Sequence, residues 1–557
     1  MSEHVILLRR FFYPRRGLLF LSMTFDLLAN LTTIALPVLV SQAFAILLGF
    51  NSMRWKWLFN ADKANGFQAI LLITAGVLLL KTGLEFVRKR LHGRIGEDWS
   101  WWLRNQIFQH HLQLSLQHYE DRGIGRYLLR FSGDLSSAQN LVTKGILQFA
   151  ADLSLLITGV VVVFLLDFMI GGIVAGALLI LLTLIAGVNH LAGSAEVSRR
   201  NNKSELLAFV NLRLLNIASV KILNRETGEI SQFERKSENI RQAGIRYARW
   251  KALADALIAF GVYAILLLVL WVTYVQQQYN PGVLSENTFA IMLLLLSLRG
   301  VFARAFQVGL LWRKGLISLK KITNLLALPL EPGRTLPEKM EYPNGALVFR
   351  DVSYYSSNHK ILEHLSFTLA PGSIGLLHDA TGAGRTVVTK LITGLYQPQS
   401  GDISLGNQRF SNLHIKDLRR SIAVVSGTAP LYGKTVLDAI ANSRKPENRE
   451  KAKVALTKWQ LLFPILSGIM PHTRLRERSP QLTNVQEILL QFLRAKLTKK
   501  PFLVLDEPFQ GLDETSRTTL LEQIQTDKDR KGILFLGASR TDFTNEKLSL
   551  DWVKSLD

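Results

Sequence analysis

A glycine-rich segment in the C-terminal half of the chain carries side chains suited to binding phosphate. Such a loop needs glycines that let the backbone approach, a cation for the outer phosphates, and a hydroxyl for Mg²⁺ at a helix N-terminus. Against the pattern Gly-x-x-x-x-Gly-Lys-Ser/Thr, Gly384 and Thr386 agree, but Asp379 replaces the first glycine and Arg385 replaces the lysine. A purely structural glycine turn would also fit this segment. The candidate phosphate-binding residues are Asp379, Thr381, Gly382, Ala383, Gly384, Arg385, Thr386 and Val387.

A second chemical feature is the apolar run 502–505, which ends in the two carboxylates Asp506 and Glu507. At the end of a buried strand, Asp506 could hold Mg²⁺ together with Thr386, and Glu507 could polarise an attacking water. The alternative is that Glu507 only completes a folded strand end. Both features in one domain, at this separation, favour a nucleoside triphosphate site with weak Mg²⁺ ligation.

The elements around these features alternate between strands and helices. Apolar runs typical of strands cover 346–355, 373–377, 502–505 and 533–536, and 387–396 has the pattern of a helix. This alternation predicts a parallel α/β sheet, and together with the glycine-rich loop the region 346–557 resembles a P-loop NTPase-like α/β domain. Before it, the prolines of 329–345 predict a linker, because neither a helix nor a central strand tolerates that proline spacing.

The N-terminal region, 1–328, is a predicted membrane domain. The chain is 48% apolar, and every stretch long enough to cross a bilayer as a helix of about 20 residues lies in this region. The first stretch is too long for a cleaved signal peptide and follows four arginines, so we expect a retained helix. The six expected spans are 17–50, 68–87, 145–166, 168–188, 253–275 and 289–312.

The basic residues predict how these spans are oriented. Lys and Arg number 66 against 43 Asp and Glu, a net charge of +23. They are concentrated in the long connections 88–144 and 199–251, whereas Asp167, 276–288 and 51–67 hold few or none. Because basic loops stay on the cytoplasmic side, both long connections and both termini are expected there. The charge is therefore a topology signal, and we expect a lipid-membrane protein with no nucleic-acid partner.

Composition also excludes several kinds of site. The chain has no cysteine. Disulfide frameworks, zinc sites with thiolate ligands and cysteine nucleophiles are therefore ruled out.

Taken together, these motifs resemble an ATP-binding cassette (ABC) half-transporter of the exporter type. In the membrane domain, Tyr119–Gln139 and Ser219–Glu226 resemble the segments around the two coupling helices. In the cassette, Arg419–Val425 resembles the approach to the glutamine loop, and Asp506–Pro508 with Gly511–Asp513 resembles the Walker B and D-loop pair. The resemblance implies a six-helix membrane bundle with long cytoplasmic extensions, a cytoplasmic nucleotide-binding domain, ATP and Mg²⁺ as ligands, and a location in a bacterial inner or plasma membrane.

Several family positions carry other residues here. Ser356 stands where an aromatic residue stacks on adenine, Gly427 where the family has the loop glutamine, and Ser539 where it has the switch histidine. The signature segment reads Leu482, Thr483, Asn484, Val485 and Gln486, with Asn484 and Val485 in place of the two glycines. These differences imply a degenerate domain that is also short at its C-terminus, with weak or absent binding of ATP and Mg²⁺ and little or no ATPase of its own.

Three functions remain open at this point. In the family each ATP lies between one cassette's phosphate loop and the other cassette's signature, so a homodimer would combine two altered parts twice. We therefore expect a transport subunit that depends on a competent second half-transporter, as a heterodimer. The alternatives are a membrane scaffold or regulator that does not transport, and an active homodimeric exporter.

Three aspartates near the cytoplasmic ends of membrane spans are candidates for a substrate cavity: Asp26, Asp152 and Asp255. Ionisable groups at that depth face a cavity or a partner. A vestibule lined by them would prefer cationic or amphipathic substrates. The alternative is that they are solvated or paired with Arg299, Arg304 or Lys81. Lys81 and Glu85 are spaced to pair with each other on one helix face.

Overall fold

The computed structural model describes residues 3–47, 63–122, 127–128, 130–279, 286–334, 345–356, 359–379, 382–427, 431–443, 445–475, 482–543 and 549–556. The chain divides into two compact units. The helical unit comprises Met1–Leu112 and Arg122–Leu328, and the α/β unit comprises Gln113–Asp121 and Pro329–Asp557. A short segment between membrane helices, Gln113–Asp121, is thus part of the α/β unit.

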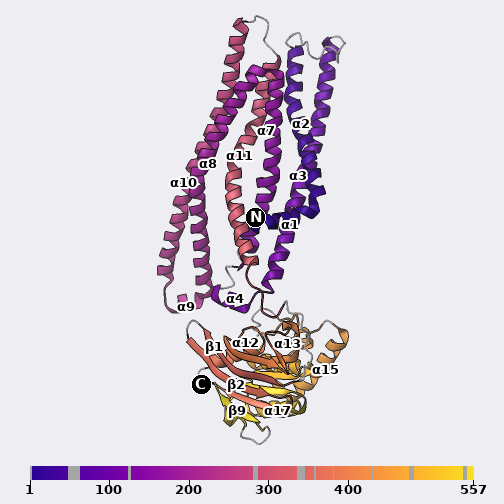
Figure 1. Ribbon diagram of the computed structural model, residues 1–557, viewed down its shortest axis with the longest axis vertical. Helices are drawn as coiled ribbons and strands as arrows, with labels where there is room; N and C mark the ends of the chain where they lie inside the picture. Colours follow the sequence, from indigo (N-terminus) through magenta and orange to yellow (C-terminus); the bar gives the residue numbers. More distant parts are fainter. Residues whose placement is uncertain are drawn as a thin grey trace. The chain divides into compact units, whose positions relative to one another are not determined.

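The helical unit consists of long helices that run side by side (Figure 1). Six helices in the described ranges are long and apolar enough to cross a membrane, which confirms the predicted number. Residues 48–50, the end of the first predicted span, lie outside the described ranges. The elements are α1 (Glu3–Phe12), η1 (Tyr13–Arg15), α2 (Arg16–Leu47), α3 (Lys63–His111), η2 (Arg130–Asp134), α6 (Leu135–Asn140), η3 (Leu141–Gln148), α7 (Phe149–Leu166), α8 (Phe168–Leu215), α9 (Ile217–Ile222), α10 (Glu226–Tyr279) and α11 (Glu286–Leu326).

These helices are longer than the apolar spans inside them. At 1.5 Å per residue, the 48 residues of α8 measure about 72 Å, against a hydrocarbon thickness of about 30 Å. Asp167 alone separates α7 from α8, and its carboxylate caps α8 by accepting the Ile170 N–H at 2.9 Å. The turn is tight because Gly171 packs directly on Phe164, where a Cβ would come within 2.8 Å.

The α/β unit contains two sheets, and its parallel sheet confirms the predicted α/β domain. An antiparallel sheet has the order β2-β1-β4-β5, and a parallel sheet has the order β6-β7-β8-β3-β9. The strands are β1 (Leu347–Ser356), β2 (His359–Leu369), β3 (Ile374–His378), β4 (Ser400–Leu405), β5 (Gln408–Arg409), β6 (Ile422–Ser426), β7 (Phe502–Asp506), β8 (Gly532–Leu536) and β9 (Trp552–Ser555). The helices are α4 (Leu116–Arg122, joined to the unit through Asp121), α12 (Ala383–Ile392), α13 (Ile415–Ser421), α14 (Val436–Ala441), α15 (Pro446–Leu462), η4 (Pro464–Leu466), α16 (Asn484–Leu497), α17 (Glu514–Gln525), η5 (Lys528–Arg530) and η6 (Arg540–Phe543).

The helix expected over 387–396 begins and ends earlier, as α12. It ends because Gly394 adopts a φ of +66°, which lets the Leu395 N–H bond back to the Lys390 carbonyl at 2.8 Å. Such a left-handed glycine is a common helix terminator. The start of the expected linker is also structured, since Leu330 forms a β-bridge with Leu114. Residues 335–344 lie outside the described ranges.

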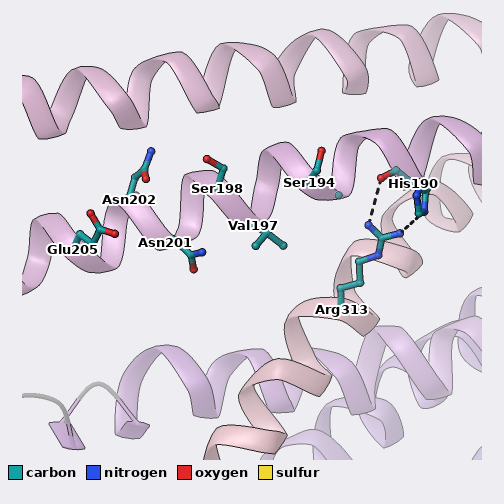
Figure 2. Close-up of a pocket in the computed structure, with 9 residues that line it drawn as sticks. His190, Ser194, Val197, Ser198, Asn201, Asn202, Glu205 and Arg313 are labelled. Carbon is teal, nitrogen blue, oxygen red and sulfur yellow. Dashed lines mark hydrogen bonds between the residues drawn. The ribbon is translucent and has the colours of Figure 1, made fainter.

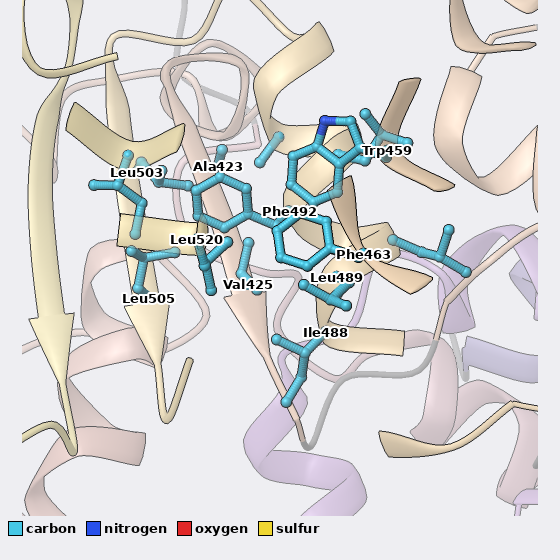
Figure 3. Packing of buried hydrophobic residues seen from close by; sticks show 14 of the residues in the cluster. Ala423, Val425, Trp459, Phe463, Ile488, Leu489, Phe492, Leu503, Leu505 and Leu520 are labelled. Atoms are coloured by element: carbon cyan, nitrogen blue, oxygen red, sulfur yellow. The ribbon is translucent and has the colours of Figure 1, made fainter. Parts of the chain in front are cut away.

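The core of the α/β unit explains why its strands are almost wholly apolar. In β7, Leu503 and Leu505 face one buried cluster, whereas Phe502 and Val504 face another on the opposite side of the sheet. Both faces of a parallel sheet are covered, so successive residues are all buried. On the first face the rings of Trp459, Phe463 and Phe492 pack around the strands (Figure 3), with Trp459 5.0 Å from Phe463 and 5.8 Å from Phe492 between ring centroids.

Because β9 packs against β3, the structure leaves no room for a side chain at Gly375. A Cβ at Gly375 would lie 2.1 Å from the indole of Trp552, which is wedged against Phe367. We therefore expect Gly375→Ala to destabilise the unit by about 1–3 kcal/mol through overpacking. Gly468→Ala is the matched control, because nothing lies within 4 Å of a Cβ there. Thermal unfolding of the purified protein checks this, and equal midpoints for the two variants would contradict it.

Candidate nucleotide-binding site

The expected phosphate loop lies between buried strand β3 and helix α12. Asp379 follows the strand, and Gly382 precedes the helix with a φ of +78°, a conformation that favours glycine. Gly384 is buried in the first turn, where a Cβ would lie 3.2 Å from both Asp379 Oδ2 and Leu362. Ala380 and Thr381 lie outside the described ranges, as does the side chain of Ala383.

The carboxylate of Asp379 lies at the N-terminus of α12. Its Oδ2 accepts the backbone N–H of Arg385 at 3.0 Å. The first amides of a helix have no partner within the helix and attract anions, which is why this position in a phosphate loop binds phosphate. Here the chain supplies an anion of its own to one of these amides.

The guanidinium of Arg385 is also engaged within the chain. Its Nη2 lies 2.7 Å from Glu507 Oε1, and both side chains are less than one-third exposed. Gly537 makes room for this ion pair, since a Cβ there would lie 2.5 Å from Arg385 Nη1 and 2.9 Å from Glu507 Cγ. The cation expected for phosphate and the carboxylate expected for water therefore neutralise each other.

Asp506 is buried at the end of β7, next to this pair. Its Oδ2 accepts the Ser426 hydroxyl at 2.9 Å. Burial raises the pKa of Asp506, and the charge of Glu507 adds to this, while Ser426 and Arg385 act in the opposite direction. The side chain of Thr386 is exposed on the first turn of α12. Within the described ranges, no cluster of three or more His, Cys, Asp or Glu side chains is arranged to hold a metal ion.

A buried glutamine that sequence reasoning missed supports this strand end. Gln491 is 1% exposed, and its amide exchanges two hydrogen bonds with the backbone of Ser426, both 3.1 Å long. The only sequence signal is that Gln491 interrupts the apolar run 488–493 of α16. Gly427, where the resemblance implies a glutamine, follows Ser426 directly, and a Cβ there would lie 3.5 Å from Gln510 Oε1.

The signature-like segment forms the N-terminus of α16. Thr483 caps the helix by accepting the Gln486 N–H at 3.3 Å, and the Gln486 side chain accepts the Thr483 N–H at 2.9 Å. Asn484 is exposed, whereas Val485 packs within the unit against Gly511 and the core. Of the two residues that replace glycine, Asn484 is therefore the one whose side chain projects from this helix end. Leu482 also packs against the core.

The remaining family positions likewise contact their own unit. At the expected adenine platform Ser356 is exposed, and the nearby Tyr354 is buried with its ring stacked on Tyr396 at 5.0 Å. At the switch position the Ser539 N–H donates to Asp542 Oδ2 at 2.8 Å, and Asp542 also pairs with Arg517.

The segment Gln113–Asp121, which carries α4, is attached to the α/β unit by polar contacts. Glu120 accepts hydrogen bonds from Lys390 Nζ, at 2.7 Å, and from the Tyr396 hydroxyl. Burial and the Glu120 carboxylate both raise the pKa of Tyr396. Gln117 donates to the Tyr354 hydroxyl at 3.2 Å. Lys390 lies near the end of α12, so one helix carries the phosphate loop at its start and this attachment at its end.

The candidate cavity aspartates of the helical unit have different surroundings. Asp26 is buried and lies 3.2 Å from His92 Nε2. Asp152 is buried and receives Arg304 in a forked contact at 2.7–3.1 Å, one of the pairings considered from the sequence. Asp255 is exposed on α10. The expected Lys81–Glu85 pair is confirmed, at 4.0 Å.

The raised pKa of Asp506 predicts a pH-dependent stability. Between the ordinary and the raised pKa the folded state binds more protons than the unfolded state, so stability falls as pH rises through that window. Asp506→Asn removes this ionisation and keeps an acceptor for Ser426. We expect its melting temperature to exceed that of wild type by a few degrees at pH 7, with the difference shrinking toward acid pH.

The control for this variant is Asp513→Asn, because the opposite sign applies there. The Ser516 hydrogen bonds lower the pKa of Asp513, so its charge favours the folded state at neutral pH. Asp513→Asn should not raise the melting temperature. A pH-independent difference between Asp506→Asn and wild type would contradict the prediction.

The Glu120 contacts predict how firmly α4 is held. Glu120→Ala removes the acceptor for both Lys390 and Tyr396, so amide hydrogen exchange in 113–121 should become several-fold faster. Glu363→Ala is the matched control, since it breaks an exposed pair with Lys360, 2.8 Å long, on β2. Exchange measured by mass spectrometry checks this, and equal protection of 113–121 in the two variants would show that Glu120 does not hold the segment.

Known proteins resemble this chain along almost its whole length. Residues 19–302 match the ABC transporter transmembrane region, and residues 362–510 match the ABC transporter domain. An uncharacterised ABC transporter ATP-binding protein of Bacillus subtilis is 23% identical over 82% of this chain and 76% of its own. An ATP-dependent lipid A-core flippase of Mannheimia succiniciproducens is 24% identical over 76% of this chain and 74% of its own.

Among solved structures, a bacterial Atm1-family ABC exporter with ATP bound has the same fold. It is 19% identical, with a TM-score of 0.81 over 97% of this chain and 93% of that one. With the transmembrane match covering more than half of the sequence, this chain belongs to the ABC transporter family and joins an exporter-type transmembrane region to one ABC domain.

Proposed function

We propose that this chain is an exporter half-transporter whose own ATP site is impaired and which works with a catalytically competent partner subunit. The observation that carries the proposal is the closure of the phosphate loop by the chain's own charges. Asp379 accepts an amide of α12, and Arg385 is paired with Glu507. The residues present therefore fit a triphosphate poorly.

The size of the penalty follows from electrostatics. Two like unit charges about 4 Å apart repel by about 4 kcal/mol at an effective dielectric constant of 20. A phosphate at the start of α12 would meet the Asp379 carboxylate at about that distance, while Arg385 would have to leave Glu507 to reach it. An arginine fork is also bulkier than a lysine ammonium in a two-sided cradle. These terms together favour weak binding of MgATP.

The missing aromatic platform adds to this weakness. Ser356 offers no ring, and Tyr354 is buried against Tyr396, so neither side chain can stack on a base. Base stacking on an aromatic ring contributes about 1–3 kcal/mol in single-stranded nucleic-acid complexes, the nearest measured analogue. Glu507 and Asp506 remain as candidate base and Mg²⁺ ligand, but Arg385, the cation expected to bring phosphates to them, is paired with Glu507.

An exposed apolar surface on the helical unit supports a partner subunit. The end of α8, helix α9 and the loop after it lie beyond the expected bilayer spans, yet Ile222 is 82% and Leu215 74% exposed. Exposed apolar patches of this kind mark interaction sites. The exposed members are Leu212, Leu214, Leu215, Ile217, Ile222 and Leu223. A second ABC half-transporter is the partner that the family organisation implies, and an intact phosphate loop on it would provide the ATP chemistry.

The membrane orientation belongs to the same proposal. With basic residues concentrated in 88–144 and 199–251, both termini and the ABC domain lie on the cytoplasmic side.

Restoration of the phosphate loop tests this proposal. Purified full-length chain should bind MgATP with a Kd weaker than about 1 mM and hydrolyse none. Asp379→Gly with Arg385→Lys should strengthen binding at least tenfold, because it removes the internal anion and frees Glu507. Asp379→Asn is the control that keeps the side chain's shape and removes only its charge; it should recover part of the gain. Isothermal titration with MgATP provides the measurement.

Two results would overturn the proposal. Hydrolysis by the wild-type homodimer that disappears in Glu507→Gln would identify an active homodimeric exporter. Tight MgATP binding by wild type, unchanged in Asp379→Gly, would show that the internal anion does not restrict the loop. Affinity capture of the tagged chain from its native membrane should recover a second ABC subunit with an intact phosphate loop. Recovery of other membrane proteins alone would favour the scaffold.

A further inference from the structure

Helix α15 of the α/β unit carries apolar side chains on two opposite faces. On one face Ala452, Leu456 and Trp459 recur at i, i+4 and i+7 and are buried, and the Trp459 ring is one of the core rings in Figure 3. On the other face Val454 and Leu461 also lie seven residues apart, but they are 51% and 82% exposed. A surface helix needs only one apolar face to pack on its domain. Packing within the unit therefore does not account for the outward face.

The segment after α15 extends this outward face. The Gln460 side chain donates to the carbonyls of Leu466, at 3.3 Å, and Ile469, at 2.8 Å, which folds the segment back on the end of the helix. The Gln486 side chain donates to the Ile465 carbonyl at 2.8 Å. These hydrogen bonds hold the segment in one place, so its exposed side chains are pre-organised for binding. We call the following exposed apolar side chains the α15 surface: Val454, Leu461, Leu462, Ile465 and Met470.

The stretch that carries the α15 surface is basic. Residues 451–475 include three lysines and one arginine and no Asp or Glu, and the acidic residues of α15 precede them. Lys451 and Lys458 lie three residues before and four residues after Val454, so both are exposed on the outward face. Among the described residues neither lies within 4 Å of a carboxylate, whereas Arg449 pairs with Asp438 at 3.2 Å. Charge complementarity therefore favours an occupant that is both apolar and acidic.

A second copy of this chain offers no matching surface among the described residues. Two α15 surfaces facing each other would bring lysines against lysines, which is unfavourable across an interface. The exposed apolar surface at the end of α8 and on α9 is basic as well, since 212–225 include three basic residues and no acidic one. The groove of about 600 Å³ on α8 is lined mainly by polar side chains, among them Ser194, Ser198 and Asn201 (Figure 2). The occupant is therefore a different chain.

The shape of the α15 surface favours a protein helix over a membrane. A helix in a membrane interface sinks its apolar face about 5–10 Å and is anchored by aromatic side chains. The opposite face of α15 is fixed in the core, and the α15 surface contains no aromatic residue. The two turns from Val454 to Leu461 span about 10 Å, which matches the i to i+7 spacing of a second helix packed alongside.

We propose that the α15 surface binds an amphipathic helix of another protein, with apolar side chains along one face and acidic side chains beside them. The apolar residues of the α15 surface supply the contact area, in the manner of helix recognition through i, i+3, i+4 and i+7 positions. Lys451 and Lys458 select the charge of the ligand. This binding uses no part of the nucleotide site, so the proposal does not rest on the proposed function.

The test uses full-length protein in phosphatidylcholine nanodiscs and three labelled peptides, with binding measured by fluorescence anisotropy. The first peptide has leucines at i, i+3, i+4 and i+7 and glutamates at most other positions. The second has the same composition in scrambled order, and the third has lysine in place of each glutamate. Wild type should bind the first at least tenfold more tightly than the other two, and high salt should weaken this binding. Equal binding of all three peptides, or no binding of the first, would overturn the proposal.

The apolar contribution is tested by Leu461→Ser with Ile465→Ser. This double change removes exposed contact area and no buried side chain, so the protein should fold and should bind the acidic peptide at least tenfold more weakly. Leu497→Ser makes the same kind of change at an exposed position at the end of α16, and it should bind like wild type. Losses of equal size in the two proteins would show that the peptide does not recognise the α15 surface.

The charge contribution is tested by Lys451→Glu with Lys458→Glu. We expect weaker binding of the acidic peptide and stronger binding of the lysine peptide, a reversal that misfolding would not produce. Lys499→Glu, at an exposed position after α16, is the control and should leave the preference unchanged. An unchanged preference in the double variant would contradict the role of the two lysines.

Two further readouts exclude other occupants. If Leu461→Ser with Ile465→Ser dissociates an oligomer seen by size-exclusion chromatography, the α15 surface is a subunit interface and the proposal fails. It fails also if that variant loses association with phosphatidylserine vesicles but retains peptide binding. MgATP titration of the same variants should give the wild-type result. Failure of this inference can therefore be distinguished from failure of the proposed function.

Discussion

The N-terminus of α12 has backbone amides without partners in the helix, and the side chains around it are arranged to satisfy them. A helix start next to a glycine turn presents partnerless amides and positive potential, and such a site must be satisfied by phosphate, water or protein. In this chain Asp379 satisfies one of these amides, and the Arg385–Glu507 pair lies beside it. Gly537 and Gly384 leave the space that these side chains occupy. The charged side chains of this loop are thus paired with other groups of the chain itself.

Apolar sequence patterns are sufficient to predict the architecture, because the spacing of apolar residues reflects which residues are buried. The apolar runs 502–505 and 533–536 became central strands, buried on both faces, and the six apolar stretches became long helices. The end of α12 was misplaced because a single glycine, Gly394, overrode the helical pattern that continues to 396. The resemblance implied that the helices extend beyond the bilayer, but the residues at which they end could not be read, since those parts have no continuous apolar signal.

The site was predictable in its residue types but not in its pairings. An arginine at the position where the resemblance implies a lysine could be read from the chain, whereas its pairing with Glu507 depends on the strand order β7-β8-β3. Gln491 was missed for the same reason, because its partner is a backbone 65 residues away. Asp152 had several possible cations in sequence, and only the packing of α7 against α11 selects Arg304. Long-range pairing is information that one sequence does not contain.

Helix α12 connects the loop that contains Asp379 with the contact between Lys390 and Glu120. Its 10 residues span about 15 Å, a length over which a packed helix moves as a rigid body. At its start are Asp379 and Arg385, and near its end Lys390 holds Glu120 of α4, whose flanking residues lead into membrane helices. The described hydrogen bonds thus connect α4 with the residues at the start of α12 through that one helix. Charged side chains of the chain itself therefore contact both ends of that helix.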